Sequence, residues 1–217
     1  MHLPEPTQGG TFEREPEGTH LAVCYRFIDL GTQESNYNGQ IKTQRKVLLS
    51  WEFPEELMTG GENGGKQCTF HQRDTWSRHE KATLGKGLEA GRGLRFSDSD
   101  VGQGGCDIRN VLGKACLITI IHEEKGDKTY ANKSSIGKLM KSMVPPSETV
   151  NPLVYFALTP DHFSMVEYGE LSESLQKTIA GSPEFKKLAG QDAASFSQDG
   201  PPDHAAEQIP DNAYVNH

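Results

Sequence analysis

Residues 45–53 read Arg45-Lys46-Val47-Leu48-Leu49-Ser50-Trp51-Glu52-Phe53. The large apolar side chains of Val47, Leu49 and Trp51 fall on every second position of this run. That period of two is typical of a β-strand that turns one face to the core. The alternation predicts the best-defined strand of the chain and places Trp51 in the core.

Four weaker strand signals flank this run. Residues 20–30 carry apolar side chains on both faces, which fits a strand that curves within a small barrel. The polar residues 31–44 follow and are interpreted as a turn into the next strand. Three further strands are expected at residues 67–73, 115–122 and 128–136.

A helix is expected between the third and fourth strands. Ser77 and Glu80 have the spacing of a capping box, in which each side chain accepts a hydrogen bond from a backbone N–H at the helix start. Five strands with a helix between the third and fourth predict a mainly β fold, the five-stranded OB-fold barrel. That fold binds oligonucleotides on strands two and three and on the flanking loops.

Composition divides the chain into four parts. Residues 1–18 are rich in Pro, Gly and Glu and are expected to be flexible. Residues 19–145 form the predicted OB-fold domain. Residues 146–190 form a C-terminal extension with a strand-like patch at 153–158 and helix starts at Ser172 and Ser182-Pro183. Residues 191–217 hold few large apolar side chains and are predicted to be a disordered acidic tail.

The net charge of −8 is unevenly distributed. Residues 19–145 contain 18 Lys and Arg against 15 Asp and Glu, whereas residues 146–217 contain three Lys against 11 acidic residues. A mildly basic body can attract phosphates while an acidic end keeps the molecule soluble. An ordinary solvated surface with an acidic end would give the same counts, so charge alone leaves both interpretations open.

Several segments together resemble a family of conserved phage proteins described as single-stranded DNA-binding or replication proteins. The resembling segments are residues 28–33, 45–52, 79–84, 112–117, 128–132 and 151–156. The resemblance covers about residues 20–190 and implies an OB-fold and a role in phage DNA replication or recombination. Besides single-stranded DNA, the partners considered are phage or host replication and recombination proteins, bound through the C-terminal tail, and further copies of this chain in a homo-oligomer; the sequence does not give the oligomeric state.

Two features depart from that pattern. Bacterial single-stranded DNA-binding proteins, a related functional class, end in an acidic tip with a terminal aromatic residue. Here the tail is acidic but its tip, residues 209–217, is not, which puts partner recruitment by that route in doubt. Lys133 falls in the fifth expected strand, where an apolar residue would suit a core better.

Sequence-independent binding of single-stranded DNA needs cations for the backbone and flat rings for the bases. The candidates lie at strand ends, in loops and on the first turn of the expected helix, where cations and aromatic rings are interleaved. Each cation taken alone is most often only solvated surface. The candidate DNA-binding residues are Tyr37, Lys42, Arg45, Lys46, Arg73, Trp76, Arg78, Lys81, Lys125, Lys128 and Tyr130.

The sequence offers little support for a catalytic or metal-binding site. The glycine-rich residues 60–67 resemble a phosphate-binding loop, but Gln67 replaces the Ser or Thr that would bind magnesium. The four cysteines, like His71 and His79, match no familiar zinc spacing, so no catalytic residue, metal or cofactor is expected.

The N-terminal residues are polar and no apolar run approaches the length of a membrane span. Together these features predict a cytoplasmic protein of the bacterial host cell with reduced, mostly buried thiols. We therefore expect a non-enzymatic protein that binds single-stranded DNA. The alternative is an OB-fold module that docks another replication protein without affinity for DNA.

Overall fold

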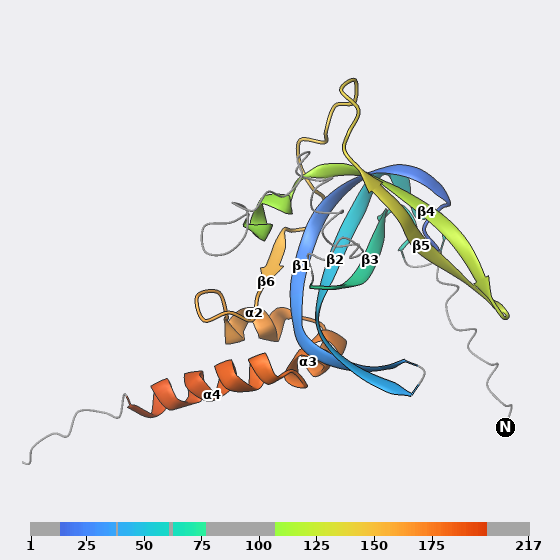
Figure 1. Ribbon diagram of the computed structural model, residues 1–217. Coiled ribbons are helices and arrows are strands. Elements are labelled where there is room, and N and C mark those ends of the chain that lie inside the picture. Colours follow the sequence, from blue (N-terminus) through green and yellow to red (C-terminus); the bar gives the residue numbers. More distant parts are fainter. Residues whose placement is uncertain (1–13, 38, 61–62, 77–106, 199–217) are drawn as a thin grey trace, which may run out of the picture.

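The computed structural model describes residues 14–37, 39–60, 63–76 and 107–198 (Figure 1). The described part is mainly β, with six strands and a few helices. The strands are β1 (Gly18–Tyr37), β2 (Gln40–Leu57), β3 (Gln67–Thr75), β4 (Ala115–Lys125), β5 (Lys128–Gly137) and β6 (Val154–Phe156).

The strands form one open sheet in the order β3-β2-β1-β4-β5, and every neighbouring pair along this path is antiparallel. The short strand β6 pairs in parallel with the middle of β1. Because no ladder joins β3 to β5 among the described strands, the sheet is open, and the expected closure into a five-stranded barrel is not confirmed.

All five strands expected from the sequence are present, and the first two are longer than expected. β1 and β2 stay paired as far as Tyr37 and Gln40, through residues 31–44 that were interpreted as a turn. The chain reverses at Gly39, whose φ of 78° suits a residue without a side chain. The prediction failed because the side chains of this hairpin arm are largely polar, while backbone pairing needs no apolar face.

One hydrophobic core fills the side of the sheet lined by alternate residues of β1–β4. Trp51 is buried there, as its alternation predicts. A short 3-10 helix, η3 (Ile108–Val111), contributes Val111. The strand residues of this core are Ala22, Cys24, Phe27, Val47, Leu49, Trp51, Phe53, Cys68, Phe70, Cys116, Ile118 and Ile120.

A second core covers the opposite face of β1 and β2. Ile28, Leu30 and Leu48 lie in it with side chains from β6 and the C-terminal helices. These helices are α2 (Met165–Glu170), α3 (Glu173–Ala180) and α4 (Pro183–Gln198), and they lie together beside the sheet in Figure 1. The apolar residues on both faces of β1 therefore reflect burial under the C-terminal extension, which the sequence interpretation had attributed to barrel curvature.

The helix starts predicted at Ser172 and Ser182-Pro183 are confirmed by α3 and α4. Helix α2 was not expected. Helix α4 continues to Gln198, past residue 191 where the disordered tail was predicted to begin; residues 199–217 lie outside the described part.

A buried ion pair joins the two edge strands of the sheet. Lys133 Nζ of β5 lies 3.6 Å from Asp74 Oδ2 of β3, and both side chains are only 3% exposed. The same ammonium lies 4.9 Å from the centre of the Trp51 ring, and burial lowers the pKa of Lys133. A lysine that looked unsuited to the core thus lies in it, paired with a carboxylate from the other edge.

Replacing Lys133 by Met should lower the free energy of unfolding by about 3 kcal/mol, because Asp74 then keeps its charge without the ammonium. The double variant K133M/D74N should recover most of that loss, since neither of the two side chains is then charged. Urea unfolding of the wild type, K133M, D74N and K133M/D74N measures the coupling. Additive losses in the double variant would show that the two side chains do not interact.

Helix α4 docks against β1 at a glycine. Gly31 has a φ of 70°, and a Cβ built on it would lie 2.5 Å from Cβ of Ser182. The next residue, Thr32, donates its backbone N–H to Glu184 Oε2 at 2.9 Å, and its hydroxyl donates to Glu184 Oε1. The close approach of helix and strand therefore requires a residue without a side chain at position 31.

The variant G31A should lower the free energy of unfolding by about 3 kcal/mol through strained backbone and collision with Ser182. The matched control is G39A, which has a similar φ of 78° but no atom within 4 Å of the added Cβ. G39A should cost about 1 kcal/mol from backbone strain alone. Equal losses in the two variants, measured by urea unfolding, would contradict the docking contact.

Candidate nucleic-acid interface

Two of the predicted cations lie on one face of β2 and β3. Lys46 lies opposite Thr75, and Arg73 lies opposite Leu48, so the two side chains are diagonal neighbours on the sheet. Lys46 Nζ donates to Thr75 Oγ1 at 2.7 Å and to Gln44 Oε1 at 2.9 Å, which fixes its position on this face. The Arg73 side chain is exposed, and Lys42 is exposed further along β2 on the hairpin arm.

Trp76 follows β3 directly and is 44% exposed. Its backbone N–H donates to the carbonyl of Arg45 at 2.8 Å, and its ring meets the Phe27 ring edge-on at 5.7 Å. Phe27 in turn stacks on Tyr155 at 5.6 Å. The row of three rings supports Trp76 from one side and leaves much of its surface open to solvent, as a base-stacking residue requires.

A second group of predicted residues lies on the β4–β5 hairpin. Lys125 and Lys128 face each other next to the turn, and Tyr130, which is 45% exposed, lies opposite Glu123. Lys125 Nζ is 3.7 Å from Glu123 Oε2, so one of the two lysines is partly neutralised. In Figure 1 the tip of this hairpin projects away from the end of β3, so the two groups of candidates are separate.

Arg45 has an internal role. Its guanidinium donates two hydrogen bonds to the buried carboxylate of Asp29 and a third, at 3.2 Å, to the carbonyl of Leu158. The hydrogen bonds to Asp29 raise the pKa of Arg45. Asp29 also accepts the backbone N–H of Leu158 at 3.2 Å, so the pair fastens the C-terminal extension to β1. Arg45 is therefore less available to a phosphate than its position in the sequence suggests.

Three of the predicted site residues cannot be placed. Arg78 and Lys81 lie outside the described residues, as does the helix expected to begin at Ser77. Tyr37 ends β1, but its side chain is outside the described part.

Sequence reasoning considered His71 only as a zinc ligand and missed its position in one cross-strand row with Ser50 and Arg26. His71 Nδ1 and Ser50 Oγ are hydrogen-bonded at 2.8 Å, and burial together with the nearby Arg26 lowers the pKa of His71. Ser50 is 0% exposed, so this serine–histidine pair is a structural hydrogen bond and presents no accessible nucleophile. Alternation along β3 from the buried Phe70 could have indicated that His71 faces outward.

The described residues contain few groups suited to metal or thiol chemistry. No cluster of three potential ligands for a metal ion occurs among them, and His79 and Cys106 lie outside this part. Cys24, Cys68 and Cys116 are buried, and burial raises the pKa of Cys24 and Cys116 to about 12, which keeps these two thiols protonated. None of the helices in the described ranges has the length and apolar content of a membrane span.

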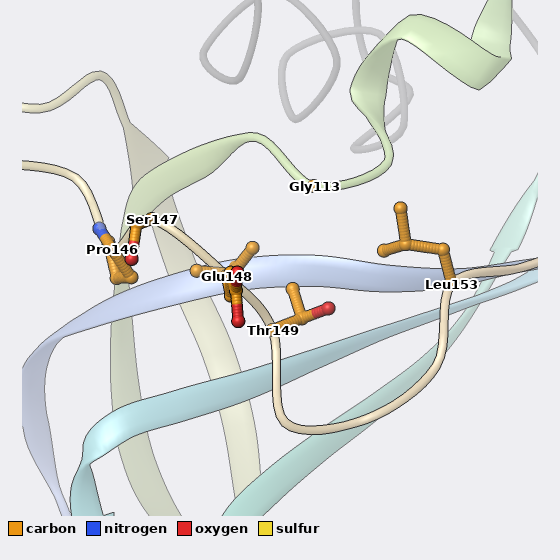
Figure 2. A pocket seen from close by; sticks show the side chains of 7 residues that line it. Gly113, Pro146, Ser147, Glu148, Thr149 and Leu153 are labelled. Carbon is orange, nitrogen blue, oxygen red and sulfur yellow. The ribbon is translucent and has the colours of Figure 1, made fainter.

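A pocket of about 350 Å³ lies between Val23 of β1, Gly113 and the loop 146–153. Figure 2 shows Pro146, Ser147, Glu148 and Thr149 on one side, with Gly113 and Leu153 nearer the other. Its lining residues include one carboxylate and neither Lys nor Arg, so the pocket lacks the cations that a phosphate requires. The loop is anchored by the buried Glu52, which accepts backbone N–H groups from Val150 and Asn151, each at 2.9 Å.

Comparisons with protein-family models and with curated proteins find no match to this chain. The resemblance to phage single-stranded DNA-binding proteins therefore stays a prediction from the segments quoted above. Segments 28–33 and 45–52 lie in β1 and β2, and 151–156 includes β6, whereas 79–84 is outside the described residues.

The internal role of Arg45 predicts a separation between stability and binding. The variant R45Q should lower the free energy of unfolding by about 2 kcal/mol, because the buried Asp29 loses its cation; the partial exposure of Arg45 limits the loss. The matched control R73Q should leave unfolding unchanged, since Arg73 is exposed on β3. Thermal or urea unfolding compares the two, and equal stabilities would show that the Asp29 pair does not hold the extension.

Proposed function

We propose that this protein binds single-stranded DNA through an OB-type barrel, without catalysing a reaction. The antiparallel path β3-β2-β1-β4-β5, with its two edges connected by the Lys133–Asp74 ion pair, supports a partly open barrel of this type. In such barrels the face of strands two and three and the loops after strands one and four hold the oligonucleotide. Those positions correspond here to the β2–β3 face and to the β1–β2 and β4–β5 hairpins.

The observation that carries the proposal is the exposure of two aromatic rings, Trp76 and Tyr130, at the ends of strands that also carry cations. Trp76 follows β3, the strand that carries Arg73, and Tyr130 lies two residues after Lys128. Each base that stacks on such a ring contributes about 1–3 kcal/mol, with little dependence on the base. Arg73, Lys46, Lys125 and Lys128 supply charge for the intervening phosphates.

The alternative function, a protein-interaction module, is favoured by a different observation. Apolar side chains are exposed along the loop after β5 and on α2, where a protein partner could cover them. The exposed side chains in this region are Met140, Val144, Val150, Leu153, Met165 and Val166. These residues are distinct from the DNA-binding candidates, so the two functions are compatible in one chain.

The test is fluorescence anisotropy with a labelled oligo(dT) at several salt concentrations. The wild type should bind at micromolar concentration or below, with affinity falling steeply as salt rises. R73Q and K128Q should each weaken binding and reduce the salt slope by about 0.7, the value for one phosphate contact on a single strand. W76A should weaken binding about tenfold or more without changing that slope, because a stacked ring carries no charge.

The control is K177Q, which removes an exposed lysine from α3 on the C-terminal extension. Its affinity and salt slope should match those of the wild type. Absence of binding by the wild type at micromolar protein and low salt would end the proposal. If K177Q and R73Q lowered the affinity for oligo(dT) equally, binding would depend on the overall positive charge and not on a defined site.

A further inference from the structure

A second pocket lies on the C-terminal extension. It has a volume of about 550 Å³ and lies between β6, the N-terminal part of α3 and the α2–α3 corner. That volume is within the range of sites that hold small molecules or a few side chains. Its apolar walls come from the aliphatic side chains of Leu153, Val154, Leu171 and Leu175 and from the aromatic Tyr155 and Phe156.

Arg26 lines this pocket in an unusual state for an arginine. Its Nε is buried without a hydrogen-bond partner, and within the described structure its side chain forms no ion pair. The guanidinium carbon lies 5.4 Å from the centre of the Tyr25 ring, a contact that orients the group but gives its Nε no acceptor. Leaving such a donor unsatisfied is costly, so the site favours an acceptor, above all a carboxylate that matches the guanidinium geometry.

Two carboxylates, Glu167 and Glu170 of α2, line the same pocket. Both residues are exposed, so their charges face solvent at the edge of the pocket. The pocket therefore offers one cation and two anions around an apolar interior. A complementary ligand has an apolar group in the middle, a basic group facing the two glutamates and an acidic group facing the arginine.

The wall that carries these carboxylates is held in place by hydrogen bonds between α2 and α3. Tyr168 donates its hydroxyl to the carbonyl of Gln176 at 3.0 Å, and Gln176 Nε2 donates to the carbonyls of Gly169 and Leu171 at 3.1 and 2.7 Å. Because the wall is fixed before any ligand arrives, little ordering opposes binding.

We propose that this pocket binds a short peptide segment of a partner protein, in which large apolar side chains lie between a basic and an acidic residue. The basic residue pairs with Glu167 and Glu170, the acidic residue pairs with Arg26, and the apolar side chains fill the space beside Leu153 and Leu171. The site goes beyond the binding of DNA and uses none of the residues assigned to it.

Two observations favour a peptide over a nucleic acid. Both aromatic residues that line the pocket are already packed, because Phe156 is 1% exposed and Tyr155 stacks on Phe27, whereas a base needs an open aromatic face. The two glutamates would repel a phosphate backbone, and the C-terminal part of the chain, residues 146–217, is acidic. The acidic extension and the cationic β2–β3 face thus suit partners of opposite charge.

The test is an NMR titration of the full chain, labelled with ¹⁵N, using pools of acetylated and amidated tetrapeptides. The two central positions are Leu, Ile, Phe or Trp, and the flanks are Lys before and Glu after, or the reverse. Control pools carry Glu at both flanks, Lys at both flanks, or Ser at both central positions. A mixed-charge pool should shift the amides of Leu153, Leu171 and Leu175, and the control pools should bind at least several-fold more weakly.

Variants of the pocket test which of its charged side chains pair with the flanking residues of the peptide. R26Q and the double variant E167Q/E170Q should each weaken the mixed-charge pool about tenfold, the effect of losing one charge-assisted hydrogen bond. E167Q/E170Q changes two exposed residues and so tests the site even if R26Q disturbs β1. The matched arginine control R73Q should leave peptide binding unchanged while it weakens oligo(dT), and R26Q should show the opposite pattern.

Three results would overturn the proposal. One is that no pool shifts these amides at millimolar concentration. Another is that the shifts persist unchanged in R26Q and E167Q/E170Q. The third is that oligo(dT) shifts the same amides and competes with the peptide, which would assign the pocket to nucleic acid.

Discussion

The central part of the ladder between β1 and β2 must be buried on both of its faces, and the rest of the structure follows from that requirement. Phe27 and Trp51 face one core, whereas Ile28 and Leu48 face the other. The remaining strands cover the first face, and the second is covered by β6, α3 and α4. Exposing that second face would leave several large apolar side chains in water, each costing about 1.5–3 kcal/mol. The C-terminal extension is therefore an obligatory part of the packing.

The alternation in residues 45–53 was sufficient to predict β2 and the burial of Trp51, because the strand period depends only on local sequence. The helix starts at Ser172 and Ser182 were likewise predictable from local capping residues. The contacts that hold the C-terminal extension against the sheet could not be predicted, because they join residues that lie far apart in the sequence. Asp29 with Leu158, and Gly31 with Ser182, acquire their roles only when the chain has folded.

The candidate site shows the same limit. Cations at strand ends indicated a plausible set, and Lys46 and Arg73 do share a face. Sequence reasoning could not distinguish Arg73, which is exposed, from Arg45, which is committed to the buried Asp29. Nor could it show that Lys133 is compensated by Asp74, since the two residues belong to opposite edges of the sheet. Burial and partner, which decide what a charge can do, are properties of the fold.

The parallel pairing of β6 with the middle of β1 has a consequence for biosynthesis. Residues that meet there are separated by most of the chain; Asp29 and Leu158, just beyond the ladder, are 129 positions apart. While the ribosome is still making the second half of the protein, that edge of β1 has no partner, although β2 has already emerged. Contacts of such sequence separation slow folding, and unpaired strand edges invite association between nascent chains. Efficient production of the protein therefore depends on how soon the last third of the chain reaches the first strand.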